Sequence, residues 1–477
     1  MASDLGPFER LMLTLACVMT LFFVVVTPPF QAPDENQHYM KALLLSQGQV
    51  LTSQRGDMIG AALPNAALDI HAVDFPTDPD GRVQLYTPAM LAKSWSADAK
   101  RPGERFADFP NVASYAPTLY APGAAGLMLG EALGLPRLGA FYMGRLVNAL
   151  TALALLFAAL RIMPFGRLAM LAVALLPTFA YQNGSLSSDA VINSIGFLGL
   201  AIALRIGAQG AGTGGATVAA LTAPVLALAK GVYLPLMAAG LRWPLWRGRS
   251  NWTLLAVMAL GAGVFVLWMR YSGGSQALYH IASRKTGETM MTAPLAEQLR
   301  VILNDPMGFA HILVTSVAER SPVYALQIVG RFGWNAILLP LVAYPIAGIM
   351  LAAAVLSGAQ ERFGLGQRIW WLMVAAGVAI LIETAMYLTG TPYAADYIQG
   401  TQGRYFLPVL PLALIALMPH YGLGNGPRIM GLAACALSLI AAASALDSFW
   451  WHGFVTSDGM PPHDSIGAAL LLPSPRW

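Results

Sequence analysis

The stretch Thr27-Pro-Pro-Phe-Gln-Ala-Pro-Asp34-Glu35-Asn-Gln-His38-Tyr39-Met-Lys41 decides how the chain is organised, and it follows directly on the apolar run Leu11–Val26. With its flanks, that run is long enough to cross a bilayer. Three prolines end it, and a second helix is predicted over residues 34–47, with two acids at the positive end of its dipole. Helical spacing puts Asp34, His38 and Lys41 on one side of this helix. The stretch therefore predicts a membrane span followed by an acid, an imidazole and an amine at the outer surface. The simpler alternative is a capped helix that lies at the membrane interface.

The composition is that of a membrane protein. Of the 477 residues, 56% are hydrophobic and only 11% are charged, whereas soluble proteins carry about 25% charged residues. The net charge of +4 is carried mainly by arginines in short loops, which indicates membrane topology rather than nucleic-acid binding. The first apolar run lacks the basic flank and the cleavage site of a signal peptide, so we expect a retained span. Cys17 and Cys435 lie inside apolar runs, and no disulfide is predicted.

Hydropathy predicts an all-α polytopic protein with about eleven membrane spans. Besides the first, the apolar runs are Leu138–Leu160, Leu168–Tyr181, Ala190–Ile206, Thr217–Ala229, Val232–Leu241, Trp252–Met269, Ala336–Leu356, Ile369–Leu388, Tyr405–Met418 and Ile429–Phe449. Arginines recur in alternate loops, and they share one side of the membrane if the N-terminus is cytoplasmic and the C-terminus lies outside. These arginines are Arg161, Arg167, Arg205, Arg242, Arg247, Arg249, Arg362, Arg368 and Arg428.

We expect the whole chain to form one domain, with a large first outer loop, a second outer loop and an outer tail. In the first loop, Tyr115–Leu133 is apolar enough to span, but counting it as a span would move the Arg161 loop outside, so we expect an interfacial helix. In the second loop, the amphipathic pattern Leu295–Ala318 predicts another interfacial helix. The expected bounds are 1–477 for the domain, 28–138 and 271–335 for the loops, and 451–477 for the tail.

Charged residues at the edges of the predicted spans form the candidate site, because a charge within a membrane costs a few kcal/mol and requires a partner or a purpose. All of them fall on the outer side, with Asp34, Glu35 and His38. Carboxylates that face fixed cations suit a phosphorylated lipid whose head group reacts. Alternatively, the cations extend to lipid head groups and the remaining acid caps a helix. These residues, with the tyrosines beside the cations, are Arg145, Asp189, Lys230, Tyr233, Arg404 and Tyr405.

Other chemistries find less support in the sequence. There is no cysteine–histidine cluster with zinc spacing and no His-Glu-x-x-His motif. A glycine-rich phosphate loop after a strand and a Gly-x-Ser-x-Gly motif are also absent. Asp34, Glu35 and His38 are candidate ligands for a divalent cation such as Mg²⁺ or Mn²⁺, and the sequence leaves metal dependence open.

Six motifs occur in order along nearly the whole chain. They are Pro28-Pro-Phe-x-Ala-Pro-Asp34-Glu35-x-x-His38, Tyr115-Ala-Pro-Thr-Leu-Tyr120, Gly144-Arg145-Leu-Val-Asn148, Ser185-Leu-Ser-Ser-Asp189-Ala, Ala229-Lys230-x-x-Tyr233-Leu-Pro235 and Gln402-Gly-Arg404-Tyr-Phe-Leu-Pro-Val-Leu-Pro411. Together they resemble the bacterial membrane-protein family catalogued as the domain of unknown function numbered 2142. That family is itself similar to the GT-C glycosyltransferases, which include protein mannosyltransferases and oligosaccharyltransferases.

The resemblance implies a GT-C-like fold in a bacterial inner membrane, with a periplasmic site that contacts membrane lipids and no nucleic acid. In GT-C enzymes an acidic residue on the helix after the first span is essential, and Asp34 matches that place. The implied donor is a polyprenyl-phosphate-linked sugar, and the acceptor is a glycan, lipid or protein. Asp34 would act as general base with inversion, Glu35 or His38 would orient it, and Lys230 and Arg404 would stabilise the leaving phosphate.

Other functions fit part of the pattern. A transporter or flippase would also place charges at membrane depth and use broken helices, but it gives no reason for a large outer loop that begins with Asp-Glu. A non-catalytic scaffold would tolerate the loss of Asp34 without a change in product. A polysaccharide polymerase or ligase would centre on arginine and histidine in a later outer loop. The second loop holds such residues, namely His280, Arg284, His311 and Arg320.

Overall fold

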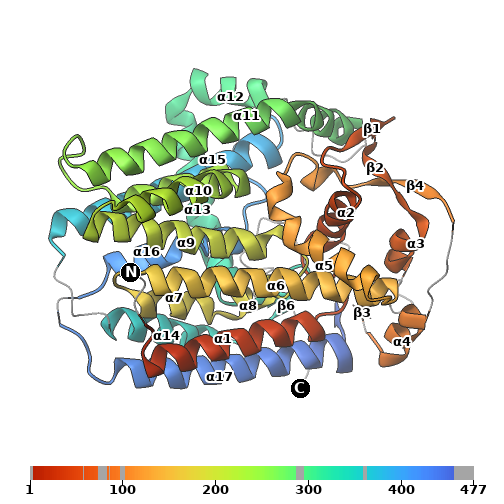
Figure 1. The fold of residues 1–477 in the computed structure, drawn as a ribbon, viewed down its shortest axis with the longest axis horizontal. Coiled ribbons are helices and arrows are strands. Elements are labelled where there is room, and N and C mark those ends of the chain that lie inside the picture. Colours follow the sequence, from red (N-terminus) through yellow and green to blue (C-terminus); the bar gives the residue numbers. More distant parts are fainter. Residues whose placement is uncertain are drawn as a thin grey trace.

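The computed structural model is mostly helical, and its long helices lie side by side along the longest dimension of the molecule (Figure 1). The structure describes residues 4–56, 58–72, 83–84, 86–96, 102–285, 295–357, 363–419 and 421–455. The α-helices are α1 (Pro7–Val26), α2 (Glu35–Ser46), α3 (Asn65–Leu68), α4 (Pro88–Ser96), α5 (Ala121–Ala132), α6 (Arg137–Ile162), α7 (Arg167–Ala174), α8 (Pro177–Asn183), α9 (Ser188–Gln209), α10 (Thr213–Ala229), α11 (Arg249–Lys285), α12 (Leu295–Asn304), α13 (Pro306–Val329), α14 (Ala343–Ser357), α15 (Leu365–Gly390), α16 (Leu410–Ala416) and α17 (Gly426–Leu446).

Short helical turns and strands connect these helices. The 3₁₀ helices are η1 (Asp69–Ala72), η2 (Pro110–Val112), η3 (Pro117–Leu119), η4 (Gly231–Gly240) and η5 (Gly403–Phe406), and η6 (Asp447–Trp451) is a π-helical turn. The strands are β1 (Ser53–Arg55), β2 (Met58–Pro64), β3 (Val83–Gln84), β4 (Glu104–Asp108), β5 (Arg331–Phe332), β6 (Ile337–Leu338) and β7 (Phe454–Val455).

Six of the described helices are long and apolar enough to cross a membrane: α1, α6, α9, α11, α15 and α17. The pair α12 and α13, bent by 103°, makes a seventh if it is counted as one span. The predicted number of eleven is not confirmed, because several of the expected spans are short or broken helices. Pro177 begins α8 after a break from α7, and Lys230 separates α10 from η4. The chain is thus a multi-pass membrane protein built on six or seven long helices.

The central helix of the bundle is α9. In its membrane-length window 89% of the residues are buried inside the protein, against 17% for α11 at the edge. A helix that is apolar on most sides is expected to be enclosed by others in this way. At its start, the Ser187 hydroxyl accepts a hydrogen bond from the backbone N–H of Asp189 at 3.1 Å, which caps the helix. This cap places Asp189 at one end of the helix on which the bundle is centred.

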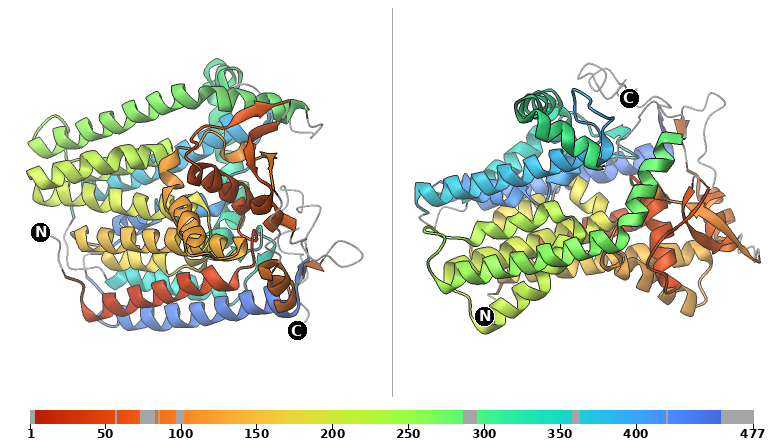
Figure 2. Two further views of the ribbon diagram at one scale, coloured as in Figure 1. Left: turned by 45° about the vertical axis from the view of Figure 1, so that its right-hand side comes forward. Right: turned by 90° about the horizontal axis from the view of Figure 1, so that it is seen from above.

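The two ends of the bundle carry different parts of the chain (Figure 2). The N-terminal end holds the start of α1 and the loops that follow α6 and α9. There Arg167 pairs with Glu9, and Arg161 pairs with Asp4, so two of the arginines expected on one side lie together. The opposite end, here called the loop end, holds α2 to α4 and the sheet formed by β1, β2 and β4.

The first loop contains structure that the sequence analysis did not predict. Strand β2 pairs antiparallel with β1 on one side and with β4 on the other. Gly60 in β2 is required by this packing, because a Cβ added there would lie 1.7 Å from the Ala107 carbonyl oxygen. The apolar segment Tyr115–Leu133 contains η3 and α5, and α5 has 12 residues and a length of about 18 Å. It is too short for a bilayer core of about 30 Å, so it is not a full span.

The second loop also differs from expectation. The pattern Leu295–Ala318 predicted one amphipathic helix, but the structure breaks it into α12 and α13, which meet at 103°. Pro306 has no backbone N–H and cannot continue α12, although it suits the first turn of a new helix. Asp305 caps that new helix, because its side chain accepts a hydrogen bond from the Gly308 N–H at 2.8 Å.

Candidate functional site

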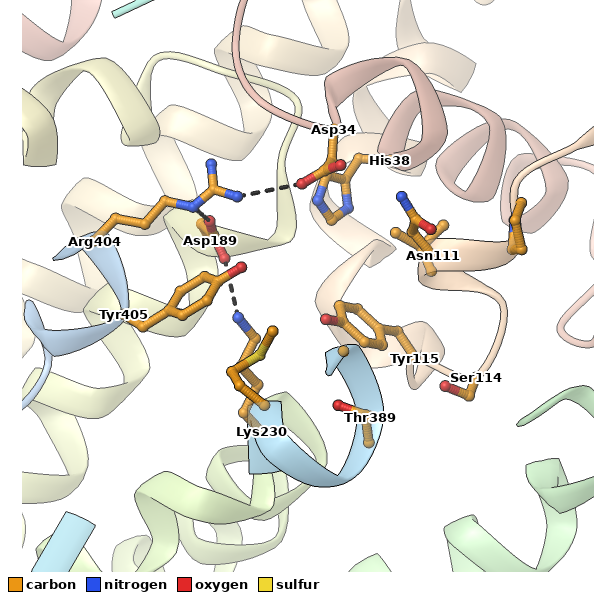
Figure 3. A pocket seen from close by; sticks show the side chains of 14 residues that line it. Asp34, His38, Asn111, Ser114, Tyr115, Asp189, Lys230, Thr389, Arg404 and Tyr405 are labelled. Carbon is orange, nitrogen blue, oxygen red and sulfur yellow. Dashed lines mark hydrogen bonds and ion pairs between the residues drawn. The ribbon is translucent and has the colours of Figure 1, made fainter. Parts of the chain in front are cut away.

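A cavity of about 300 Å³ lies at the loop end, where segments from along the whole chain converge (Figure 3). It is bounded by the start of α2, the segment 110–115, the start of α9, the end of α10, the end of α15 and η5. The described residues that line it are Asp34, His38, Pro110, Asn111, Val112, Ser114, Tyr115, Asp189, Lys230, Met386, Thr389, Gly390, Arg404 and Tyr405. Six of the nine residues singled out from the sequence are therefore brought together here, and Glu35, Arg145 and Tyr233 are not.

Four charged side chains form a continuous row along one side of the cavity. Lys230 Nζ lies 3.6 Å from Asp189 Oδ1. Arg404 Nε lies 3.3 Å from Asp189 Oδ2, and Arg404 Nη2 donates to Asp34 Oδ2 at 3.2 Å. Each cation therefore faces a carboxylate, and the four charges sum to zero. An anionic ligand must compete with Asp34 or Asp189 for the two cations.

Asp34 is held in an uncommon backbone conformation. Its φ is 60°, in the left-handed region that residues other than glycine rarely adopt, although aspartate tolerates it better than most. Phe30, four residues earlier, has a φ of 63°. Two such residues in one connection persist only when the surrounding structure holds them. Among the four charged side chains Asp34 is also the most accessible, with 27% exposure against 6% for Arg404.

A buried ion pair between Glu35 and Arg145, here called the clamp, holds this connection. Arg145 Nε and Nη2 donate to the two carboxylate oxygens of Glu35 at 2.7 and 2.6 Å, and neither side chain is exposed. The guanidinium also donates to the backbone carbonyls of Val24, Thr27 and Pro28 at 3.2, 2.5 and 3.0 Å. One side chain of α6 thus fixes the end of α1 and the chain that leaves it.

Glu35 completes the clamp from the other side. Its carboxylate accepts hydrogen bonds from the backbone N–H groups of Phe30 and Leu186, at 3.0 and 2.8 Å. Neither Glu35 nor Arg145 lines the cavity. The geometry therefore gives no support to the expected roles of Glu35 in catalysis and of Arg145 in substrate binding. The clamp instead joins α1, α2 and the approach to α9, and it fixes the backbone on which Asp34 sits.

His38 lines the cavity beside Asp34. Its Nδ1 lies 2.9 Å from the Tyr120 hydroxyl, and its ring stacks on the Tyr120 ring with centroids 5.7 Å apart. Burial lowers the pKa of His38 to about 4, even though Asp189 and Asp34 favour the charged form. The imidazole is therefore neutral at pH 7, and it can donate or accept a hydrogen bond in the cavity.

Lys41, which the helical spacing put on the same side as Asp34 and His38, does not line the cavity. Its Nζ donates to the backbone carbonyls of Val50 and Ala113, at 3.1 and 3.0 Å. Burial lowers the pKa of this lysine to about 8. The side chain thus ties the segment 110–115 to α2.

The two tyrosines expected at the site have different positions. Tyr405 lines the cavity, and Lys230 Nζ lies 4.2 Å from the centroid of its ring, a cation–π distance. Tyr233 is 1% exposed and does not line the cavity. Its hydroxyl donates to the backbone carbonyl of Tyr405 at 2.8 Å. Tyr233 therefore supports η5 from behind.

Uncharged side chains of α13 hold the segment that carries Arg404, and the sequence analysis missed them. Gln327 Oε1 accepts a hydrogen bond from the Gly403 N–H at 2.6 Å, and Ser316 Oγ accepts one from the Ile398 N–H at 3.0 Å. Neutral lining residues were also missed, since uncharged residues carry no such signal in the sequence. Those lining residues are Asn111, Ser114, Met386 and Thr389.

The suggested metal site does not fit the geometry. Both carboxylate oxygens of Glu35 are engaged by Arg145, so only Asp34 and His38 of the suggested ligands face the cavity. Within the described ranges, no group of three or more His, Cys, Asp or Glu residues is arranged to hold a metal ion.

Comparison with known proteins gives one match. Searches of curated proteins and of solved structures find no match. A family model described as "Predicted membrane protein (DUF2142)" matches residues 17–413, which include the second half of α1, the clamp and every lining residue of the cavity. The chain therefore belongs to the DUF2142 family of predicted membrane proteins.

Proposed function

We propose that this protein is a GT-C-type membrane glycosyltransferase, which moves a sugar from a polyprenyl-phosphate donor to a glycan, lipid or protein acceptor. The observation that carries the proposal is that Asp34, Arg404 and Lys230 line one cavity at one end of a membrane-spanning bundle, where Asp34 pairs with Arg404. In this proposal the loop end is periplasmic and the N-terminal end is cytoplasmic in a bacterial inner membrane, as the arginine distribution favours. The short and broken helices would complete about eleven crossings.

Lys230 and Arg404 suit a phosphate leaving group. When the bond between the anomeric carbon and the phosphate oxygen breaks, the electron pair stays on that oxygen and the phosphate gains a negative charge. Two fixed cations in a largely buried cavity stabilise such a charge strongly, because little water screens them. Arg404 offers a planar fork to phosphate oxygens, and Lys230 adds a compact point charge.

Asp34 suits the general base. The oxygen of the acceptor hydroxyl attacks the anomeric carbon on the face opposite the phosphate, so the configuration inverts, and the hydroxyl proton passes to the Asp34 carboxylate. This carboxylate is the most accessible charged group of the row, which a base must be to meet its acceptor. His38, neutral and adjacent, orients Asp34 or the acceptor hydroxyl.

The charge pairs exchange partners in this step. Arg404 donates to Asp34 at 3.2 Å before the reaction. Protonation removes the negative charge of Asp34 while the phosphate gains one, so Arg404 is freed for the leaving group at the moment it is needed. The summed charge of Asp34 and phosphate stays constant, which limits the cost of moving charge in a poorly solvated site. Asp189 keeps both cations in place throughout.

The polymerase or ligase alternative finds no support in the described residues. His311 and Arg320 lie on α13 and do not line the cavity. The side chains of His280 and Arg284 lie outside the described residues. A flippase could use the same cations to bind a lipid phosphate, but it would leave the bond between the sugar and the phosphate intact.

The test is release of free polyprenyl phosphate from labelled polyprenyl-phosphate sugars by purified protein in lipid, with membrane extract as acceptor. Asp34→Asn and Arg404→Ala should each lower the rate by roughly 100-fold or more. Glu131→Gln and Arg137→Ala are matched controls, because these exposed residues pair with each other away from the cavity, and they should keep the wild-type rate. Release by Asp34→Asn at the wild-type rate would exclude Asp34 as base, and no release by any protein across a broad donor panel would overturn the proposal.

A further inference from the structure

The cavity has a charged side and a neutral side (Figure 3). Asp34, Asp189, Lys230 and Arg404 form the charged row. The wall across from them, here called the neutral wall, comes from the segment 110–115 and the end of α15. The side chains of the neutral wall labelled in Figure 3 are Asn111, Ser114, Tyr115 and Thr389.

The backbone of the neutral wall is held from outside the cavity. Gln37 Oε1, on α2, accepts a hydrogen bond from the Asn111 backbone N–H at 2.9 Å. Trp268 Nε1, on α11, donates to the Ser114 backbone carbonyl at 2.9 Å. Two separate helices therefore fix this segment through its main chain, and its side chains are not needed for that purpose.

The side chains of the wall remain free to bind a ligand. The Asn111 amide and the Ser114 and Tyr115 hydroxyls form no hydrogen bond with any other described residue, and Figure 3 shows the Tyr115 hydroxyl directed toward the centre of the cavity. The Thr389 hydroxyl donates to the Ala385 carbonyl at 2.7 Å and keeps its acceptor lone pairs. An amide and hydroxyls both donate and accept, and the hydroxyls of a sugar require the same mixture.

A charged substituent would find no partner on this wall. A carboxylate or ammonium group that loses part of its water against this half-buried wall costs free energy unless an opposite charge meets it. The carboxylates in the lining are Asp34 and Asp189, and both already pair with Arg404 or Lys230. An ammonium group on the sugar would have to break one of these pairs, and a sugar carboxylate would compete with the phosphate for the cations.

We infer that the neutral wall recognises the donor sugar and that this sugar is a single uncharged ring; the inference rests on the glycosyltransferase function proposed above. The size of the cavity agrees with one ring. Its volume of about 300 Å³ is at the small end of the range for ligand pockets, which suits one pyranose and its phosphate. Asn111, Ser114 and Tyr115 are then residues that determine specificity.

The test compares three polyprenyl-phosphate donors that differ at one carbon: a hexose, its 6-amino-6-deoxy form and its 6-uronic acid, each in the gluco, galacto and manno series. Release of polyprenyl phosphate by wild-type protein in lipid, with membrane extract as acceptor, gives kcat/KM for each donor. We expect the neutral hexose of the preferred series to exceed both charged forms by at least about tenfold. A charged donor used as well as or better than the hexose would overturn the inference and leave the proposed function standing, whereas no release from any of the nine donors would overturn both.

A charge placed on the wall provides the second arm. Asn111→Asp should raise the ratio of kcat/KM for the amino sugar to that for the hexose by roughly tenfold, because the ammonium then meets an unpaired carboxylate. The side chain of Asn111 is exposed, so this variant should fold. Asn65→Asp, in the first loop but outside the cavity, should leave the ratio unchanged. An unchanged ratio in Asn111→Asp would remove Asn111 from sugar recognition and overturn the inference.

Discussion

Replacing Arg145 by alanine should destabilise the protein, and any loss of activity should follow from that loss of structure. The guanidinium makes five hydrogen bonds, two to Glu35 and three to backbone carbonyls at the end of α1. Without it, the Glu35 carboxylate stays fully buried with no cation beside it. Removing one partner of a buried pair costs about 3–5 kcal/mol in the free energy of unfolding. We therefore expect a clear fall in the unfolding midpoint of Arg145→Ala in detergent or lipid.

The double variant Glu35→Ala/Arg145→Ala distinguishes a structural role of the clamp from a role in the reaction. Because each single variant leaves its partner buried and unpaired, the double variant should lose less stability than the sum of the singles, with a coupling of at least about 1 kcal/mol. The exposed pair Glu131 and Arg137 is the control, and its variants should change stability by about 0–1 kcal/mol. If Arg145→Ala kept the wild-type unfolding midpoint but lost activity, the clamp reasoning would be refuted and Arg145 would belong to substrate binding.

Two further predictions concern residues around the cavity. Stability should fall as the pH drops from about 6.5 toward 4, because His38 in the unfolded chain binds a proton at its ordinary pKa of 6.5 while the folded imidazole stays neutral down to about 4. In a pH titration of the unfolding midpoint, His38→Gln should flatten the slope over this pH range. An unchanged slope would show that His38 is not its source. Gln327→Ala removes the acceptor of the Gly403 N–H. Because the neighbouring Arg404 is then misplaced, donor turnover should fall roughly tenfold. Turnover at the wild-type rate would show that this contact does not position the arginine.

The charged part of the candidate site could be predicted from the sequence. An unpaired charge is costly at the edge of an apolar run, which is where Asp189, Lys230 and Arg404 lie. Each of these residues was therefore expected to have a partner of opposite charge on the same side of the membrane. The structure pairs Lys230 with Asp189 and Arg404 with both Asp189 and Asp34. Membrane topology constrained these contacts even though Asp34 and Arg404 are 370 residues apart.

Neighbouring acids and neutral residues could not be sorted in the same way. Asp34 and Glu35 are adjacent in the sequence, yet Asp34 faces the cavity while Glu35 is enclosed with Arg145. Asp34 precedes α2 in a left-handed backbone conformation, whereas Glu35 is the first residue of the helix. Asn111 and Thr389 belong to the lining without any charge that would mark them. Hydropathy also counted apolar runs without showing that breaks such as those at Pro177 and Lys230 shorten the helices within them.

The fate of the bond between the sugar and the lipid phosphate tests the proposed function most directly. Purified protein in vesicles would receive a labelled polyprenyl-phosphate sugar and a hydroxyl acceptor, with Asp34→Asn as the matched variant. The proposal predicts free polyprenyl phosphate and a glycoside of inverted anomeric configuration from wild type, and neither product from Asp34→Asn. Lipid-linked sugar that crosses the bilayer with this bond intact would contradict the proposal and make the protein a transporter.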